Sequence, residues 1–125
     1  MSRSLPQLEK LPGAAGIKVF MGSSTGDLLV DDEETLARIL ALIERRAAFH
    51  AEDEARLARA GMRFAATATR RSHSEWRDAE AALAATAALL RLATAAGKRV
   101  HVLHVSTAAG DARCSRCIRT WRASR

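Results

Sequence analysis

The sequence predicts an α/β protein with a parallel sheet, because segments typical of strands alternate with segments typical of helices. Strand character occurs at residues 16–22, 47–50 and 100–106, and a helical pattern lies between each successive pair. Strands that are joined by helical crossovers form parallel sheets. The length of 125 residues and the hydrophobic fraction of 48% are sufficient for one domain with a buried core.

The first strand signal covers residues 16–22, Gly-Ile-Lys-Val-Phe-Met-Gly, which are rich in β-branched and aromatic types between two glycines. A loop of small residues follows at 22–27. Lys18 is the unusual residue of this strand, since a lysine is almost never fully buried without a partner. It is either the solvent-exposed lysine of an edge strand or a functional amine with a lowered pKa.

A helix is expected to begin at Asp31 or Asp32, whose carboxylates can accept hydrogen bonds from the first turn. Its apolar residues recur at helical spacing and form one stripe: Leu36, Ile39, Leu40 and Ile43. Arg45 and Arg46 are expected at its C-terminal end, where positive charge is favourable.

Residues 47–50 give a weaker strand signal, and residues 55–72 predict a short helix followed by a loop. A long helix is expected over residues 79–96, with Ser74 or Asp78 as its cap.

Gly97 is placed to end that long helix. Residues 100–106, Val-His-Val-Leu-His-Val-Ser, form a nearly continuous apolar run and are the clearest strand signal in the chain.

The net charge of +6 and the pI near 10.6 are concentrated at the end of the chain. Residues 112–125 contain five arginines and no acidic residue, which leaves 15 basic against 14 acidic residues over 1–111. The sequence therefore divides into a nearly neutral body, 1–111, and a basic tail, 112–125. The arginines of the tail lack the aromatic interleaving typical of nucleic-acid binding, so a nucleic-acid partner is not expected.

Targeting and membrane signals are not found in the sequence. The first residues lack the apolar core of a signal peptide, and no run of about 18 apolar residues occurs. We therefore expect a cytoplasmic chain without a membrane partner.

Histidines and cysteines are the candidate ligands. His50 and His104 lie near the ends of neighbouring predicted strands, where parallel α/β proteins place their chemistry, although a strand-end histidine can also be structural. Strict alternation along the strand places His101 and His104 on opposite faces. Cys114 and Cys117 have metal-site spacing, but no second pair follows, so a structural zinc is not expected there.

Four blocks, in order along the chain, resemble bacterial dihydroorotases over about residues 7–111. They are Gly16-Ile-Lys-Val-Phe-Met-Gly-Ser-Ser-Thr-Gly26, Phe49-His-Ala-Glu-Asp-Glu54, His73-Ser-Glu-Trp-Arg-Asp-Ala-Glu80 and Val100-His-Val-Leu-His-Val-Ser-Thr107. Allantoinases and dihydropyrimidinases have a similar layout without the Ser-Ser-Thr-Gly loop.

The resemblance implies about three central β/α units of a (β/α)₈ TIM barrel that holds two zinc ions. It also implies that Lys18, His50 and His104 are metal-ligand residues and that the lysine can be carboxylated to bridge the ions. A shared metal-bound water would attack the ring amide. The body has neither the family's His-x-His pair nor its last-strand aspartate, and its length is half of the approximately 250 residues that such a barrel needs.

The resemblance stops near residue 111, where the composition also changes. For one choice of codons, a one-base shift converts Cys114–Ala123 into Leu-Leu-Ala-Leu-His-Pro-Asp-Leu-Ala-Ser, an apolar helix followed by a turn. The basic tail is therefore a candidate frameshift product.

The resemblance implies an enzyme by descent that hydrolyses dihydroorotate, a cyclic amide, to N-carbamoyl-aspartate. We expect the isolated chain to be a truncated and inactive fragment. The alternatives are a fragment of an allantoinase or dihydropyrimidinase type, a binding module that uses the basic tail, and a partner that docks on an intact enzyme through its sheet edges.

Overall fold

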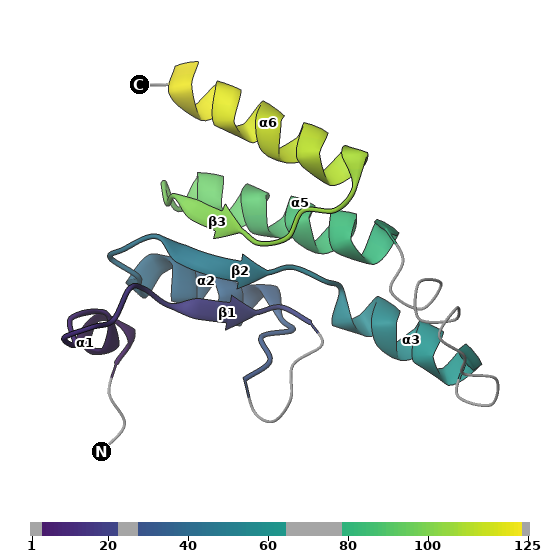
Figure 1. Ribbon diagram of the computed structural model, residues 1–125, viewed down its shortest axis with the longest axis horizontal. Helices are drawn as coiled ribbons and strands as arrows, with labels where there is room; N and C mark the ends of the chain where they lie inside the picture. Colours follow the sequence, from purple (N-terminus) through teal and green to yellow (C-terminus); the bar gives the residue numbers. More distant parts are fainter. Residues whose placement is uncertain (1–3, 23–27, 65–78, 124–125) are drawn as a thin grey trace.

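The computed structural model describes residues 4–22, 28–64 and 79–123, which form a three-stranded parallel sheet with helices (Figure 1). The strands are β1 (Lys18–Phe20), β2 (Ala47–His50) and β3 (Val100–Val102), in the order β1-β2-β3. Both neighbouring pairs are parallel. The predicted α/β class is confirmed.

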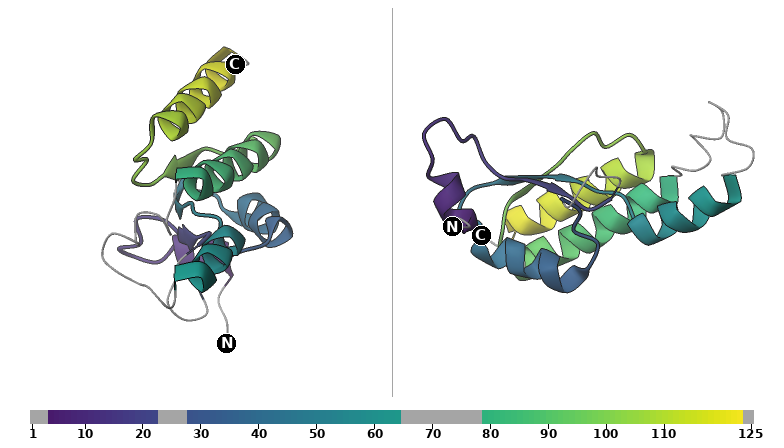
Figure 2. Two further views of the ribbon diagram at one scale, coloured as in Figure 1. Left: turned by 90° about the vertical axis from the view of Figure 1, so that its right-hand side faces the viewer. Right: turned by 90° about the horizontal axis from the view of Figure 1, so that it is seen from below.

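Five helices occur in the described ranges. They are α1 (Leu5–Glu9), α2 (Glu33–Leu42), α3 (Glu54–Phe64), α5 (Ala79–Ala95) and α6 (Ala108–Ala123). The crossover from β1 to β2 contains α2, and the chain between β2 and β3 contains α3 and α5. In both views of Figure 2, α6 lies beside α5. No helix within these ranges is long and apolar enough to cross a membrane.

The hydrophobic core lies on one face of the sheet, where α2 and α5 cover it (Figure 2). Alternation along the strands turns Val19 and Phe49 to this face, where they are 4% and 0% exposed. The predicted stripe of α2 packs against them, with Leu36, Leu40 and Ile43 buried and Ile39 partly buried. The opposite face carries Lys18 and His101, both exposed, so one side of the sheet is without a covering layer in the described chain.

Both ends of the predicted helices can be compared with the structure. Asp32 is the N-cap of α2, and its carboxylate accepts a hydrogen bond from the backbone N–H of Thr35 at 2.7 Å. Gly97 follows α5 with a φ of +64°, a conformation that glycine adopts without steric cost. The predicted caps Ser74 and Asp78 lie outside the described residues.

The prediction for Arg45 and Arg46 was wrong, because α2 ends at Leu42 and has no basic residue in its last turn. The chain turns at Ile43 into extended backbone. Arg45 instead donates hydrogen bonds from its guanidinium to the backbone oxygens of Glu9 and Ala14 at 3.2 and 3.0 Å.

Two further differences concern the last strand and the tail. Strand β3 ends at Val102, although the apolar run continues to residue 105. Helix α6 runs without interruption through position 111, where the sequence composition changes. The division into 1–111 and 112–125 stays a prediction.

Candidate metal centre

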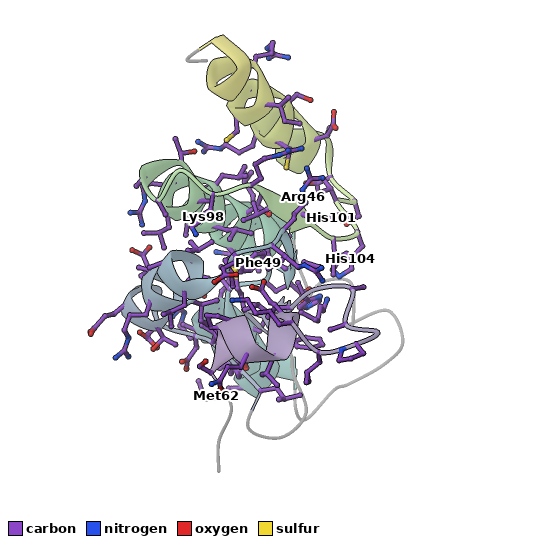
Figure 3. The ribbon with its side chains drawn as sticks, turned by 90° about the vertical axis from the view of Figure 1, so that its left-hand side faces the viewer. Arg46, Phe49, Met62, Lys98, His101 and His104 are labelled. Atoms are coloured by element: carbon purple, nitrogen blue, oxygen red, sulfur yellow. The ribbon has the colours of Figure 1, made fainter. Side chains whose placement is uncertain are left out.

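The carboxyl ends of β2 and β3 bring together the two histidines that the sequence singled out. Nδ1 of His50 lies 2.7 Å from Nε2 of His104, and the ring centroids are 4.6 Å apart. His50 is the last residue of β2, whereas His104 lies two residues beyond β3. Figure 3 shows His104 on the side of the sheet opposite α2 and α5.

Strict alternation did not predict the face on which His104 lies. Val100 and Val102 pack against the core, so continued alternation would turn His104 toward the helices. The strand ends first, and His104 adopts a φ of +36°, the only positive value among the non-glycine residues described. This left-handed conformation directs the ring to His50 on the open face.

Glu52 contacts the other nitrogen of His50. Its Oε2 lies 2.8 Å from His50 Nε2, and the two side chains are 14% and 15% exposed. Glu52 lies in the block Phe49–Glu54 that resembles dihydroorotases, but the sequence pattern assigned it no role. The signal that could have identified it is its position two residues after a strand-end histidine, where an extended chain places both side chains on one face.

Lys18 lies on the same open face, in the row next to that of His50. It pairs in register with Ala48, and Phe20 pairs with His50. The Lys18 ammonium lies 4.6 Å from the centroid of the Phe20 ring, and that ring lies 6.0 Å from the ring of His50. Partial burial lowers the pKa of Lys18, because desolvation disfavours the charged amine. The structure thus places Lys18 on the exposed edge strand β1, which the sequence offered as one interpretation, and on the same face of the sheet as Phe20 and His50.

The cysteine pair lies in a different place. Cys114 and Cys117 line a groove of about 500 Å³ between α6, α5 and β3, near the amino ends of the strands. Burial raises the pKa of the Cys114 thiol, and the charges of Asp111 and Cys117 add to this effect. The groove also contains His101, which does not join His50 and His104.

The facing nitrogens of His50 and His104 lie closer together than two ligands of a zinc site. With Zn–N distances of about 2.0–2.1 Å, two nitrogens in a tetrahedral site lie about 3.3 Å apart, so the rings need to separate by roughly half an ångström. The carboxylate of Glu52 on the far nitrogen of His50 is the support that zinc-binding histidines usually have. In the described ranges no three His, Cys, Asp or Glu side chains gather to hold an ion, and a catalytic zinc takes three protein ligands. Among the described residues, His50 and His104 are therefore fewer ligands than a catalytic zinc takes.

Comparison with known proteins shows what the fold of this chain is similar to. No family model and no curated protein sequence matches the chain. Among solved structures, it is similar to dihydropyrimidinase from Brevibacillus agri NCHU1002, with a TM-score of 0.83 and 26% identity over 93% of this chain and 26% of that one. D-hydantoinase from Bacillus sp. AR9 gives a TM-score of 0.75 and 27% identity, over 82% of this chain and 23% of that one.

The chain is also similar in fold to L-hydantoinase (dihydropyrimidinase) from Arthrobacter aurescens, with a TM-score of 0.82 and 23% identity over 93% of this chain and 28% of that one. These enzymes are amidohydrolases with TIM-barrel folds, and the described residues are similar in fold to part of each of them. The chain spans about a quarter of the length of each. The solved structures named here are hydantoinases and dihydropyrimidinases, whereas the sequence blocks resemble dihydroorotases.

Proposed function

We propose that this chain forms three central β/α units of a cyclic amidohydrolase barrel, which hydrolyses a ring amide C–N bond. The observation that carries the proposal is the contact between His50 and His104 at the carboxyl ends of β2 and β3. The ends of barrel strands are where TIM-barrel enzymes place their catalytic groups. The fold similarity to dihydropyrimidinase and hydantoinases gives this contact a chemical context.

The open face of the sheet supports the same proposal. In a closed barrel, helices cover the outer face and side chains of the inner face surround the site. Within the described ranges, the helices that pack on the sheet lie on the other face from Lys18, His50 and His101. The side chains proposed as ligands therefore lie on the surface that barrel closure would turn inward.

In the proposed barrel, His50, His104 and a carboxylated Lys18 would hold zinc. When bound, the metal would polarise the ring carbonyl and supply a nucleophilic water. His50 is oriented by Glu52. Other strands would have to provide the remaining ligands, because the described residues provide too few.

Two substrate classes remain, each favoured by one observation. The four sequence blocks favour dihydroorotate, and the structural neighbours favour dihydropyrimidines or hydantoins. All three substrates contain a cyclic amide whose hydrolysis gives a carbamoyl amino acid.

Genomic sequencing followed by enzyme assay tests the proposal. We expect the DNA on either side of this coding region to encode the other barrel strands, including a His-x-His pair upstream and an aspartate downstream. The protein translated from the joined frame should open dihydroorotate, dihydrouracil or hydantoin in a zinc-dependent reaction, and His50→Ala should abolish it. The proposal is wrong if no frame encodes such strands.

We also propose that residues 112–125 are translated out of the native frame, which the composition change supports. The same DNA sequence decides this point. A single-base shift near codon 112 should open a frame that continues the dihydroorotase-like sequence. A continuous gene without such a frame would show that α6 is the native helix.

The isolated chain should have no turnover, because the three strands of the described residues cannot close an eight-stranded barrel. Purified chain, supplied with zinc and bicarbonate, is assayed with the three cyclic amides. Turnover that disappears in the His104→Ala variant would show that this chain assembles a complete site.

A further inference from the structure

We infer that Glu52 is a positioning residue that fixes the proton of His50 on Nε2 and thereby exposes the Nδ1 lone pair to a metal ion. This inference rests on the proposed function for the metal, but the proton position belongs to the chain itself. Glu52 does not have to touch an ion in this role. It acts through the imidazole of His50.

The first step is the short contact between His50 Nε2 and Glu52 Oε2, 2.8 Å long. An ionised carboxylate can only accept hydrogen bonds, so the imidazole nitrogen must be the donor. A ring nitrogen without a proton at this distance would place its lone pair next to a lone pair of the carboxylate oxygen, and the two would repel. Both side chains are about one-seventh exposed, which limits the competition from water.

The second step concerns the opposite side of the ring. A neutral imidazole has one N–H, so protonation at Nε2 leaves Nδ1 as an acceptor. The 2.7 Å contact of His50 Nδ1 with His104 Nε2 then takes its proton from His104. In the metal-free chain both histidines are therefore Nε2–H tautomers.

Metal binding changes only one of these tautomers. An ion between the rings needs lone pairs on His50 Nδ1 and His104 Nε2. His50 already presents its lone pair, whereas the His104 proton has to move to that ring's Nδ1. No net proton is gained or lost. His50 needs no change of tautomer, because its hydrogen bond with Glu52 already selects the Nε2–H form in the folded chain.

The backbone around Glu52 is held on two sides, which keeps the carboxylate in place. At Gly22, a Cβ atom would lie 2.5 Å from the carbonyl oxygen of Glu52 and 3.0 Å from its Cβ, so only glycine allows this approach. The backbone N–H of Met21 donates to the carbonyl of His50 at 2.9 Å. On the other side, Asp53 N–H donates to the carbonyl of Ala81 at 3.1 Å.

The test is ¹⁵N NMR of the histidine rings in the full, metal-free chain at mildly alkaline pH, where an ordinary imidazole is neutral. His50→Ala and His104→Ala spectra assign the two rings. We expect wild-type His50 as the Nε2–H tautomer, and titration with Zn²⁺ should convert only His104 to the Nδ1–H form. Observation of His50 as an Nδ1–H tautomer or as an imidazolium would overturn the inference without any variant.

Variants then test the role of Glu52. Glu52→Ala should leave His50 as a mixture of tautomers and weaken Zn²⁺ binding by about 10- to 100-fold. Glu52→Gln keeps the volume, but its amide can donate as well as accept, so it should shift the tautomer in the same direction by less. Glu34→Ala removes an equal charge from the exposed surface of α2 and should change neither readout.

The His50 tautomer and the Zn²⁺ affinity together separate this inference from the proposed function. If Glu52→Ala changes the tautomer but wild-type chain binds no Zn²⁺, the positioning role is supported, and the ion needs the ligands that other strands would provide. If Zn²⁺ binds equally well to wild type and to both folded Glu52 variants with an unchanged His50 tautomer, the positioning role is wrong and the metal site stands.

Discussion

His104 occupies a backbone conformation that most side chains avoid. Its φ of +36° lies in the left-handed region, which costs an L-residue about 1–2 kcal/mol relative to the right-handed one. Strain of this kind persists where the surrounding structure or a function requires it. Here the conformation directs the His104 ring to His50, at 2.7 Å.

His104→Gly should therefore separate stability from metal binding. Glycine removes the left-handed strain but costs about 0.5–1 kcal/mol of backbone entropy, so the free energy of unfolding should stay within about 1 kcal/mol of wild type. Zn²⁺ binding, measured by calorimetry, should be lost. His101→Ala, which alters an exposed histidine outside the contact, is the matched control and should retain binding. A large loss of stability in His104→Gly would contradict the strain argument.

Asp32 makes the stability of α2 dependent on pH. Hydrogen bonds from the backbone and side chain of Thr35 lower the pKa of Asp32 below its ordinary value. Because the folded pKa is the lower one, the stabilisation is complete above the ordinary carboxyl pKa of about 3.9 and is lost as the pH falls through the folded value.

The Asp32→Asn variant isolates this effect, since asparagine is also a good N-cap and does not titrate. The melting temperature of wild type should exceed that of the variant near neutral pH, and the difference should shrink as the pH falls below about 4. All other carboxylates are common to both proteins and cancel. A constant difference across this range would show that the charge of Asp32 does not contribute.

The sequence predicted the position of a residue where that position depends only on the strand or helix that carries it. Strand ends identified His50 and His104 as neighbours, and the cap at Asp32 follows from its side-chain chemistry. The orientation of His104 could not be predicted, because the early end of β3 and the positive φ break the alternation. Glu52 was missed because its role depends on a contact and not on a motif.

Among the elements, α1 carries a buried carboxylate that bonds it to the body. Glu9 is 1% exposed, and its Oε2 accepts the backbone N–H groups of Glu44 at 2.8 Å and Arg45 at 3.4 Å. These donors lie in the turn between α2 and β2. Glu9 therefore connects the N-terminal helix to the segment that enters the central strand.

Glu9→Ala should destabilise the chain by about 2–4 kcal/mol, because two backbone donors lose their partner. Urea unfolding measures this change. Glu44→Ala is the control: it removes an exposed ion pair with Lys10 but keeps the backbone N–H, so it should cost no more than about 0.5 kcal/mol. Equal losses in both variants would contradict the role given to Glu9.

Strands β1 and β2 and helices α2 and α5 follow patterns of apolar residues that burial against the sheet requires, and the sequence predicted them. Helix α1 was not predicted, because its five residues are too few for a periodic pattern, although Ser4 and Gln7 form a capping box. Helix α6 was missed because the interpretation of the basic tail rested on its composition.

At the scale of the whole molecule, the described chain is a sheet covered on one face. The covered face contains the core, and the open face contains Lys18, His50 and His101. A single apolar layer must therefore supply the stability of the sheet. Phe49 on the central strand β2 lies at its centre with no exposed surface (Figure 3).

Phe49→Ala should consequently unfold the chain at room temperature. Truncation of a buried phenylalanine costs about 3–5 kcal/mol, comparable with the whole stability of a small domain, about 5 kcal/mol at the lower limit. Met62→Ala in α3 is the matched control, because Met62 is 75% exposed and its loss should stay within about 0.5 kcal/mol. Circular dichroism in the far ultraviolet compares the two variants with wild type. A folded Phe49→Ala chain with a normal melting transition would mean that the one-sided core is not what holds the sheet together.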